Sequence, residues 1–242
     1  MHCIISMDDT DNLETRGTGW LVEDACTRMR AMDWGDFSMI SRHQLYVHPD
    51  IPYTSHNSSM VFAADLRVDR EEVVAFLGDF LRAESAPGSD PGLCVTGTLD
   101  AAARKRLVDF GRSAKNTVLT KDQAHDLAAA LGIHLSEHGG TGGGVIGALA
   151  GVGLRLWGED GRYRGWFHYA REGTEMTVGE LCRHEAVDEV RTSGGAVVEA
   201  GWRVVLGDRV KTVRQGGKSV LLVHPAQNGT HRMLTKNELK KY

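Results

Sequence analysis

Three carboxylates lie close together near the start of the chain. Asp8, Asp9 and Asp11 follow the apolar run 3–5, and residues 8–12 are called the acidic loop below. Carboxylates crowded at the end of a strand repel one another and lose hydration, so the arrangement is costly unless a cation occupies it. Hard oxygen ligands of this kind suit Mg²⁺, but Asp also caps helices and forms turns. The cluster alone therefore leaves two alternatives open, a Mg²⁺ site and a capped loop.

A glycine-rich stretch is the second pattern with chemical potential. Five of the six residues 139–144 are glycine, and an apolar helical run follows. Glycine allows close backbone approach, and exposed amides at a helix start attract anions, so the stretch suits a phosphate. It is neither a Walker A loop nor a convincing dinucleotide fingerprint, and a flexible loop or tight helix packing is the alternative. The candidate phosphate-binding residues are Gly139, Gly140, Thr141, Gly142, Gly143, Gly144 and Gly147.

The two patterns together favour a triphosphate site, because such a site needs both an anion cradle and Mg²⁺. A polar loop at 49–59 adds donors directly after an expected strand, and Arg42, Asn57 and Ser58 are its candidate ligand contacts. Lone histidines such as those of this loop seldom bind metal, and the other histidines, including His125, His134 and His168, show no zinc-type spacing.

Three more residues are candidates near these patterns. Arg16 either pairs with the acidic loop or reaches a transferred phosphoryl group, and Thr18 either takes part in the site or caps a helix. Lys115 is a candidate phosphate contact, although a lone lysine on a loop usually faces solvent.

Hydrophobic periodicity predicts the elements that position these residues. Strands alternating with helices indicate an α/β (α+β) domain with a mixed sheet, followed by a small C-terminal β-rich module. We place the first domain at 1–175 and the basic β-rich module at 176–242. Expected strands are 3–7, 36–48, 60–68, 93–95, 202–206, 210–213 and 219–223, with a hairpin of 154–157 and 163–169; expected helices are 18–32, 70–83, 101–110 and 121–131.

Composition sets mild limits. The 242 residues are 41% hydrophobic and 25% charged, which is typical of globular proteins and allows one large domain or two small ones. No run approaches the roughly 18 apolar residues of a membrane span and no signal peptide is visible, so we expect a cytoplasmic location. The four cysteines lie far apart without a CxxC pair, which predicts core thiols rather than a zinc ribbon or a disulfide framework.

Charge is distributed unevenly along the chain. Residues 202–242 hold 9 Lys and Arg against 2 Asp and Glu, whereas residues 1–201 hold 19 against 30. A local excess of positive charge can contact a phosphate backbone, although a Lys-rich surface is as often only solvated. RNA is therefore a candidate partner of the C-terminal segment.

The ordered set of motifs resembles the archaeal tRNA-isoleucine agmatinylcytidine synthetases. The resemblance rests on Asp8-Asp9-Thr10-Asp11 after a first strand and on the Thr-Gly-Trp-Leu helix start at 18–21. It rests also on the His-Pro-x-Ile-Pro-Tyr-x-Ser-x-Asn loop at 48–57 and on Gly-Val-Ile-Gly-Ala-Leu-Ala at 144–150. It covers roughly residues 3–68 and 112–156.

The resemblance implies a kinase-like domain beside a ferredoxin-like part, and activation of a tRNA cytidine by ATP and Mg²⁺ before agmatine is attached. It implies that Asp8, Asp9 and Asp11 serve the Mg²⁺ and phosphoryl chemistry, that Thr18 lies close to the ATP phosphates, and that residues 142–147 form the glycine-rich segment. The family also carries a nucleic-acid-binding OB domain and a zinc ribbon, and this sequence has no zinc-type cysteines.

The leading interpretation is an ATP- and Mg²⁺-dependent enzyme that activates its substrate by phosphoryl transfer, a ligase or kinase-like enzyme related to tRNA modification. A small-metabolite kinase or ligase that uses no RNA is one alternative. A non-catalytic nucleotide sensor is another, although pure binding rarely needs so much crowded negative charge. The sequence leaves the acceptor substrate and the oligomeric state open.

Overall fold

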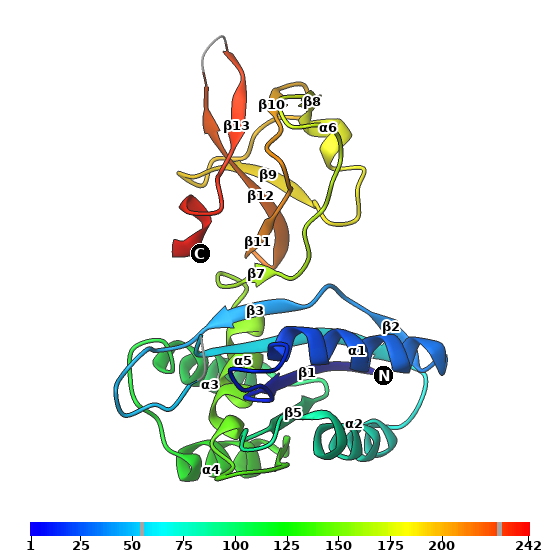
Figure 1. Cartoon of the computed structure of the whole chain (residues 1–242), viewed down its shortest axis with the longest axis vertical. Coiled ribbons are helices and arrows are strands. Elements are labelled where there is room, and N and C mark those ends of the chain that lie inside the picture. Colours follow the sequence, from blue (N-terminus) through cyan, green and yellow to red (C-terminus); the bar gives the residue numbers. More distant parts are fainter. Residues whose placement is uncertain (54–55, 227–228) are drawn as a thin grey trace. The chain divides into compact units, whose positions relative to one another are not determined.

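The chain divides into two compact units, residues 1–157 and 158–242, in a computed structural model that describes residues 1–53, 56–226 and 229–242 (Figure 1). Ser55 of the motif at 48–57 lies outside the described residues. The division falls earlier than the expected end of the first domain at 175. Residues 154–157, expected as a hairpin strand, are instead the end of helix α5 (Gly144–Trp157). The hairpin prediction was wrong because a short apolar run cannot be assigned to strand or helix from periodicity alone.

The first unit is built on an antiparallel sheet with β1 (His2–Asp8) at its centre. The strand order is β6–β5–β1–β4–β3, and β2 also pairs with β4. The predicted strand 36–48 is divided into β2 and β3. The bounds are β2 (Gly35–Phe37), β3 (Ser41–Gln44), β4 (Ser58–Leu66), β5 (Gly92–Thr96) and β6 (His134–Glu137).

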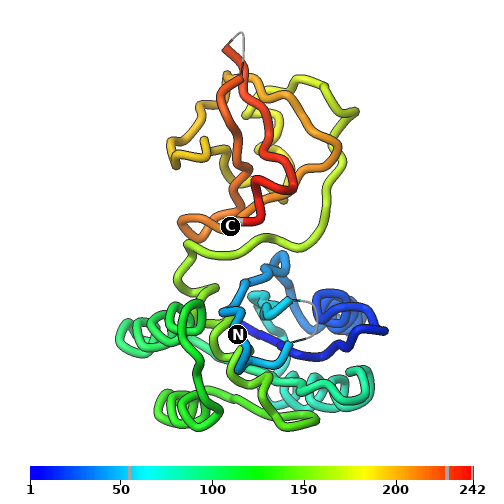
Figure 2. Tube along the Cα trace, turned by 60° about the vertical axis from the view of Figure 1, so that its left-hand side comes forward, coloured from blue at the N-terminus to red at the C-terminus, as the bar shows by residue number. Residues whose placement is uncertain are grey.

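Alternation along β1 sends its side chains into two different layers. Cys3, Ile5 and Met7 are buried in a core shared with α1 (Thr18–Ala31) and α2 (Arg70–Glu84). Ile4 packs into a second core with residues of α3 (Ala101–Ser113), α4 (Lys121–Leu131) and α5. These helices are the green segments of Figure 2. Because Ser6 and Asp8 share the face of Ile4, Asp8 belongs to the side of the sheet that α5 covers.

The element order β1–α1–β2/β3–β4–α2–β5 is the β-α-β-β-α-β succession of ferredoxin-like folds. The four helices predicted in this unit are confirmed, and local capping explains where two of them begin. Asp100 accepts a hydrogen bond from the amide of Ala103 at 2.7 Å, and Thr120 forms a capping box with Gln123. Helix α1 begins one residue after its N-cap Gly17, so Thr18 is its first helical residue rather than its cap.

The second unit is β-rich, as predicted, and includes parallel as well as antiparallel strand pairs. Its strand order is β7–β11–β12–β13–β10–β8, and β9 pairs with β12. Mostly valine and leucine side chains, from the strands, from α6 and from the loops between them, fill its main core. The bounds are β7 (Arg162–Tyr163), β8 (Glu175–Thr177), α6 (Val178–Leu181), β9 (Glu189–Thr192), β10 (Arg203–Val205), β11 (Thr212–Gln215), β12 (Lys218–Pro225), β13 (His231–Met233) and the 3₁₀ helix η2 (Glu238–Lys241). The two units together confirm the predicted α/β (α+β) class with a β-rich C-terminal module.

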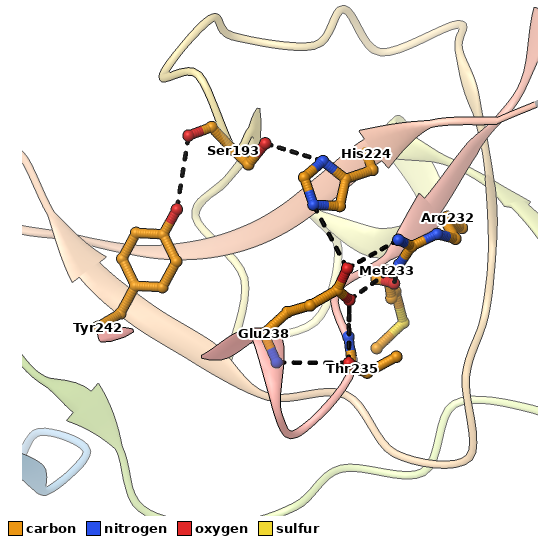
Figure 3. Close-up of polar contacts among 7 residues, drawn as sticks. All are labelled: Ser193, His224, Arg232, Met233, Thr235, Glu238 and Tyr242. Atoms are coloured by element: carbon orange, nitrogen blue, oxygen red, sulfur yellow. Dashed lines mark hydrogen bonds and ion pairs between the residues drawn. The ribbon is translucent and has the colours of Figure 1, made fainter. Parts of the chain in front are cut away.

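A polar cluster fixes η2 to the rest of the second unit (Figure 3). Glu238 accepts hydrogen bonds from both terminal nitrogens of Arg232, at 3.0 and 2.8 Å, and from the amide of Thr235 at 2.8 Å. Hydrogen bonds from Arg232 and Thr235 hold the pKa of Glu238 well below its usual range. On the other side of this carboxylate, His224 Nε2 lies 3.6 Å from Glu238 Oε1, and His224 Nδ1 shares a 2.8 Å hydrogen bond with Ser193.

Two general expectations can be compared with the structure. Cys3, Cys26 and Cys94 are buried as predicted, but Cys182 is exposed, so the prediction of core thiols was wrong for that residue. Within the described ranges, none of the helices has both the length and the apolar character that a membrane crossing requires.

Candidate functional site

One edge of the first unit's sheet collects most of the predicted site residues. Asp8 at the end of β1 is opposite Gly92 at the start of β5, and Gly92 is opposite Glu137 at the end of β6. On the other side of β1, the pairing of Gln44 with Ser58 places the end of β3 beside the start of β4. The acidic loop, the segment before β5, the glycine-rich stretch and the loop between β3 and β4 therefore all leave the sheet at this edge, called the site edge below.

Asp8 is buried against the first turns of α5. A Cβ atom at Gly147 would lie 1.6 Å from Asp8 Oδ2, so only glycine allows the helix to lie this close to the carboxylate. One turn further along, a Cβ atom at Gly151 would lie 2.3 Å from Ser59 Oγ. Gly147 thus serves close helix–sheet packing, one of the alternatives that the sequence left open for the glycine-rich stretch.

Burial and neighbouring charge make the ionised form of Asp8 unfavourable. Burial raises the pKa of the Asp8 carboxyl well above its ordinary value, and the nearby charges of Asp9 and Asp11 raise it further. A hydrogen bond from the Asp9 amide opposes this shift. Asp8 forms no ion pair with a basic side chain among the described residues.

Asp9 is strained in its backbone and perturbed in its titration. Its φ of 54° lies in the left-handed region, which is uncommon for a residue other than glycine. Burial, followed by the charges of Asp90 and Asp11, raises the pKa of Asp9 from 3.8 to about 6, although the Asp90 amide donates a hydrogen bond to its carboxylate. The cost of keeping this side chain ionised would fall if a cation bound beside it.

Asp11 is used differently from its two neighbours. Its Oδ1 accepts hydrogen bonds from Thr18 Oγ1 at 2.7 Å and from the Thr18 amide at 3.2 Å, so Asp11 caps the start of α1. Thr18 Oγ1 in turn accepts a bond from the Thr10 amide at 3.3 Å. The hydroxyl of Thr10 is buried and has no hydrogen-bond partner within the described part of the chain, which is costly unless a ligand satisfies it.

The glycine-rich turn (residues 139–143) is folded against the acidic loop through Asp90. Gly140 and Gly142 adopt left-handed φ values of 55° and 77°. The Thr141 amide donates to Asp90 Oδ1 at 2.6 Å, and the Thr141 hydroxyl donates to Asp90 Oδ2. The turn therefore reaches the acidic loop by way of a residue that lies in neither segment.

A lysine holds the same turn from its other side. Lys121 Nζ donates to the carbonyl oxygen of Thr141 at 2.6 Å and to Glu137 Oε2 at 2.9 Å. Sequence patterns missed Asp90, Lys121 and Glu137. Asp90 belongs to none of the motifs or elements predicted from the sequence, and Lys121 is only the first residue of the predicted helix 121–131. No spacing rule connects either residue with a glycine-rich stretch far away in sequence.

A second group at the site edge is bound to the backbone of the loop between β3 and β4. Arg42 Nε donates to Ser58 Oγ at 2.9 Å, and Asn57 Nδ2 donates to the Tyr46 carbonyl at 2.6 Å. Lys115 Nζ donates to the Gln44 carbonyl at 3.0 Å, so it is not simply solvent-facing. These contacts give Asn57 and Lys115 a structural role in holding the loop.

Arg16 does not join the acidic loop in this structure. Its guanidinium lies over the ring of Trp20, 4.6 Å from the centroid, and forms no ion pair with a described carboxylate. The structure thus brings Asp8, Asp9, Asp11, Thr18 and the glycine-rich turn together, while Arg16 stacks on the surface of α1.

The donors at the site edge fit a cation that takes part of its coordination from a ligand. The described residues contain no group of three or more His, Cys, Asp or Glu side chains arranged to hold a metal by themselves. Mg²⁺ at a phosphate site needs only one or two carboxylates, because phosphate oxygens and waters supply the rest. Asp8 and Asp9, with raised pKa values and no basic partner among the described residues, have the chemistry for that role. The acidic loop also carries the buried Thr10 hydroxyl, which has no partner among the same residues.

Comparisons with known proteins give matches in structure only. No family model matches the chain, and no curated protein matches it in sequence. A crystal structure of TiaS in complex with its isoleucine tRNA, AMPCPP and agmatine matches with a TM-score of 0.57 and 25% identity over 74% of this chain. The chain shares its fold with TiaS. The resemblance inferred from the motifs is therefore confirmed.

Two further structures agree with this match. The tRNA fluorescent labeling enzyme has a TM-score of 0.56 at 25% identity, covering 74% of this chain and 42% of that one. The complex of TiaS with the same tRNA and ATP has a TM-score of 0.56 at 24% identity, covering 82% of this chain and 49% of that one. This chain spans less than half the length of the TiaS chains that it matches, 43% in the complex with AMPCPP and agmatine.

Proposed function

We propose that this chain is an ATP- and Mg²⁺-dependent enzyme that modifies tRNA. The observation that carries the proposal is the meeting of the acidic loop with the glycine-rich turn at one sheet edge, in a fold shared with a protein solved with tRNA, AMPCPP and agmatine. Fold alone would be a weak reason, because one fold hosts many activities. The perturbed carboxylates and the left-handed glycines provide the chemical reason.

The residues of the site edge divide into distinct roles. Asp8 and Asp9 would hold Mg²⁺, whose charge would stabilise the negative charge of the phosphates. The amides of the glycine-rich turn would bind a phosphate, apart from those of Thr141 and Gly142, which donate to Asp90 and to the Gly139 carbonyl. Lys121 lies beside that turn and also pairs with Glu137. Asp11 orients Thr18 through its two hydrogen bonds and so fixes the start of α1 against the acidic loop. Arg42 and Arg16 are the further cations that can offset charge developed in transfer.

The reaction proposed for this site is phosphoryl transfer to a substrate, which activates that substrate for later attack. We favour RNA as the substrate because the second unit carries the basic segment 202–242 and the fold is that of TiaS. A small metabolite as substrate, with no RNA, is the second candidate, and the acidic balance of residues 1–201 favours it.

Product analysis tests the reaction class directly. The purified chain is incubated with ATP, Mg²⁺ and tRNA, and AMP, ADP, phosphate and pyrophosphate are separated and measured. Asp9→Asn keeps the side-chain shape and tolerates a positive φ but removes the charge, so it should abolish ATP turnover while circular dichroism shows an intact fold. Asp126→Asn, the same change on an exposed position of α4, should keep full turnover. Full turnover in Asp9→Asn would overturn the proposal.

Gel shifts test the RNA partner. Binding through the basic segment should weaken in the variant Arg209→Glu/Lys236→Glu/Lys240→Glu, and its salt dependence should become shallower by about one unit of slope for each lost phosphate contact. Arg106→Glu, an exposed change on α3, is the control. Turnover of ATP without any binding of tRNA, in either the parent chain or the control, would leave the small-metabolite enzyme as the better proposal.

A further inference from the structure

Asp90 uses its side chain and its backbone to connect segments that are far apart in sequence. Its carboxylate accepts from the amide of Thr141 at 2.6 Å and from the Thr141 hydroxyl. Its carbonyl oxygen accepts from the amide of Gly144, the first residue of α5, at 3.1 Å. Its own amide donates to the carboxylate of Asp9. One residue therefore contacts the acidic loop, the glycine-rich turn and the start of α5.

Apart from Asp90, the glycine-rich turn is held by an internal hydrogen bond from the Gly142 amide to the Gly139 carbonyl at 3.2 Å, and by the start of α5, whose amides donate to its last carbonyls. Gly140 and Gly142 both have left-handed φ values, and glycine loses more conformational freedom on ordering than any other residue. Lys121 holds the turn at the Thr141 carbonyl, which leaves the amide and hydroxyl of Thr141 to Asp90. A Cβ atom at Gly140 would lie 1.7 Å from Asp90 Oδ1, so the turn is also closely fitted around this carboxylate.

The choice of a carboxylate at this position needs an explanation. A neutral asparagine or serine could accept a hydrogen bond from Thr141 without placing a second negative charge beside Asp9. Hydrogen bonds to an ionised acceptor are roughly twice as strong as those between neutral groups, so the carboxylate holds the turn more firmly. The unfavourable proximity to Asp9 is tolerable where a cation is to bind.

We propose that Asp90 is a positioning residue that clasps the glycine-rich turn to the acidic loop, so that the turn is already ordered when a nucleotide phosphate arrives. The inference rests on the proposed function, because it assigns to Asp90 the order of the phosphate-binding part of that site. Without the clasp, part of the free energy of nucleotide binding would be used to order the turn, and the affinity for the nucleotide would be lower by that amount.

Two variant series test the clasp, one on each side of the contact. Asp90→Ala removes both acceptors, whereas Asp90→Asn keeps one oxygen acceptor and removes the charge. Thr141→Val removes the hydroxyl and keeps the amide, whereas Thr141→Ser keeps both. Asp109→Ala, a change on an exposed part of α3, is the matched control. Thermal unfolding verifies that each variant is folded. If Asp90→Ala does not fold, the milder variants Asp90→Asn and Thr141→Val carry the test.

Two measurements are made on each variant. Hydrogen exchange of the Thr141 amide in the absence of nucleotide should be at least about tenfold faster in Asp90→Ala than in the parent chain, with Asp90→Asn intermediate. Titration with Mg²⁺-ATP should show a dissociation constant about tenfold higher in Asp90→Ala and in Thr141→Val than in the parent chain. Thr141→Ser, which keeps the hydroxyl, should have the dissociation constant of the parent chain. A double variant of Asp90 and Thr141 should be no worse than the more severe single variant, because both remove one contact.

The outcomes separate this inference from the proposed function. Unchanged exchange of Thr141 in the folded Asp90 variants overturns the clasp, whatever the nucleotide affinity. Faster exchange together with unchanged ATP affinity overturns the positioning role. Failure of the parent chain to bind Mg²⁺-ATP overturns the proposed function, and with it the positioning of a phosphate, while the exchange rates still decide whether the clasp exists.

Discussion

Replacing Asp9 by asparagine should stabilise the fold when no divalent cation is present. In the native state the Asp9 carboxylate is partly buried, lies near the charges of Asp90 and Asp11, and has no basic partner among the described residues. Asparagine keeps an oxygen that accepts the hydrogen bond from the Asp90 amide, and it tolerates the φ of 54° better than most residues. The substitution therefore removes an unfavourable charge with little change in geometry.

The size of the effect follows from the shift in pKa. A rise from 3.8 to about 6 is about two pKa units, or ~3 kcal/mol between the ionised and neutral forms. The side chain is not fully buried, so solvent screening reduces the expected gain to about 1–3 kcal/mol at pH 7.5. The native state binds this proton more tightly than the unfolded state, so the parent chain loses stability as pH rises from 3.8 to 6. The advantage of Asp9→Asn should thus be near zero at about pH 4 and complete above about pH 6.

Urea unfolding in EDTA at several pH values measures this difference. The matched control is Asp33→Asn, because Asp33 also has a left-handed φ, of 55°, but its side chain is exposed and pairs with Arg67. We expect the control to change stability by less than about 0.5 kcal/mol at every pH. Saturating Mg²⁺-ATP should stabilise the parent chain and much less the variant, which reverses their order. A loss of stability in Asp9→Asn at about pH 7.5 in EDTA, or a gain that persists unchanged at about pH 4, would refute the reasoning.

Three further predictions concern packing and charge elsewhere. Gly147→Ala should destabilise the first unit by about 2–4 kcal/mol in urea unfolding, because its Cβ would overlap Asp8, whereas Gly97→Ala, with open space around it, should be nearly neutral. Burial, and after it the charge of Arg82, lowers the pKa of His138, so Arg82→Met should raise that pKa in an NMR titration. The parent chain should lose part of its stability as pH falls below about 6.5, because the imidazole of the unfolded chain then takes up a proton more readily than that of the folded chain. Glu238→Gln should speed hydrogen exchange of the Thr235 and Leu239 amides. Acid should have the same effect on the parent chain. The lowered pKa of Glu238 means that its carboxylate stabilises the native state above the ordinary pKa of 4.5, and this stabilisation is lost as pH falls.

Periodicity was a good guide where an element buries one continuous face. The helices at 18–32, 70–83, 101–110 and 121–131 all appear as α1 to α4, because their apolar residues repeat at helical spacing. The N-cap side chains of α3 and α4, Asp100 and Thr120, also mark where those two helices start. It failed at 154–157, where every residue of the surrounding helix except Ile146, Leu156 and Trp157 is buried and no polar face marks the helical period. Periodicity also predicted a single strand at 36–48, where the structure has β2 and β3. Both of these pair with β4, but a break at 38–40 separates them.

The candidate site shows a similar division. Sequence reasoning chose Asp8, Asp9, Asp11 and the glycine-rich stretch from local crowding of charge and from glycine content, which are visible in a short window. The connections among them are not local. Asp90 and Lys121 reach the glycine-rich turn only because β1, β5 and β6 are neighbours in the sheet and α4 precedes β6. Register and strand order come from the packing of the whole unit, so no motif could predict these two contacts.

The contact between Asp8 and Gly147 has a consequence for the newly made chain. The acidic loop leaves the ribosome long before α5 is synthesised, so for most of translation the carboxylate has no helix to cover it and remains hydrated. Burial of Asp8, and the electrostatic cost that comes with it, begins only when α5 docks on the sheet. If the site binds Mg²⁺ and nucleotide as proposed, the docking of this helix is the step at which these ligands would assist folding, because from that moment they would offset a cost that the unfolded chain does not bear.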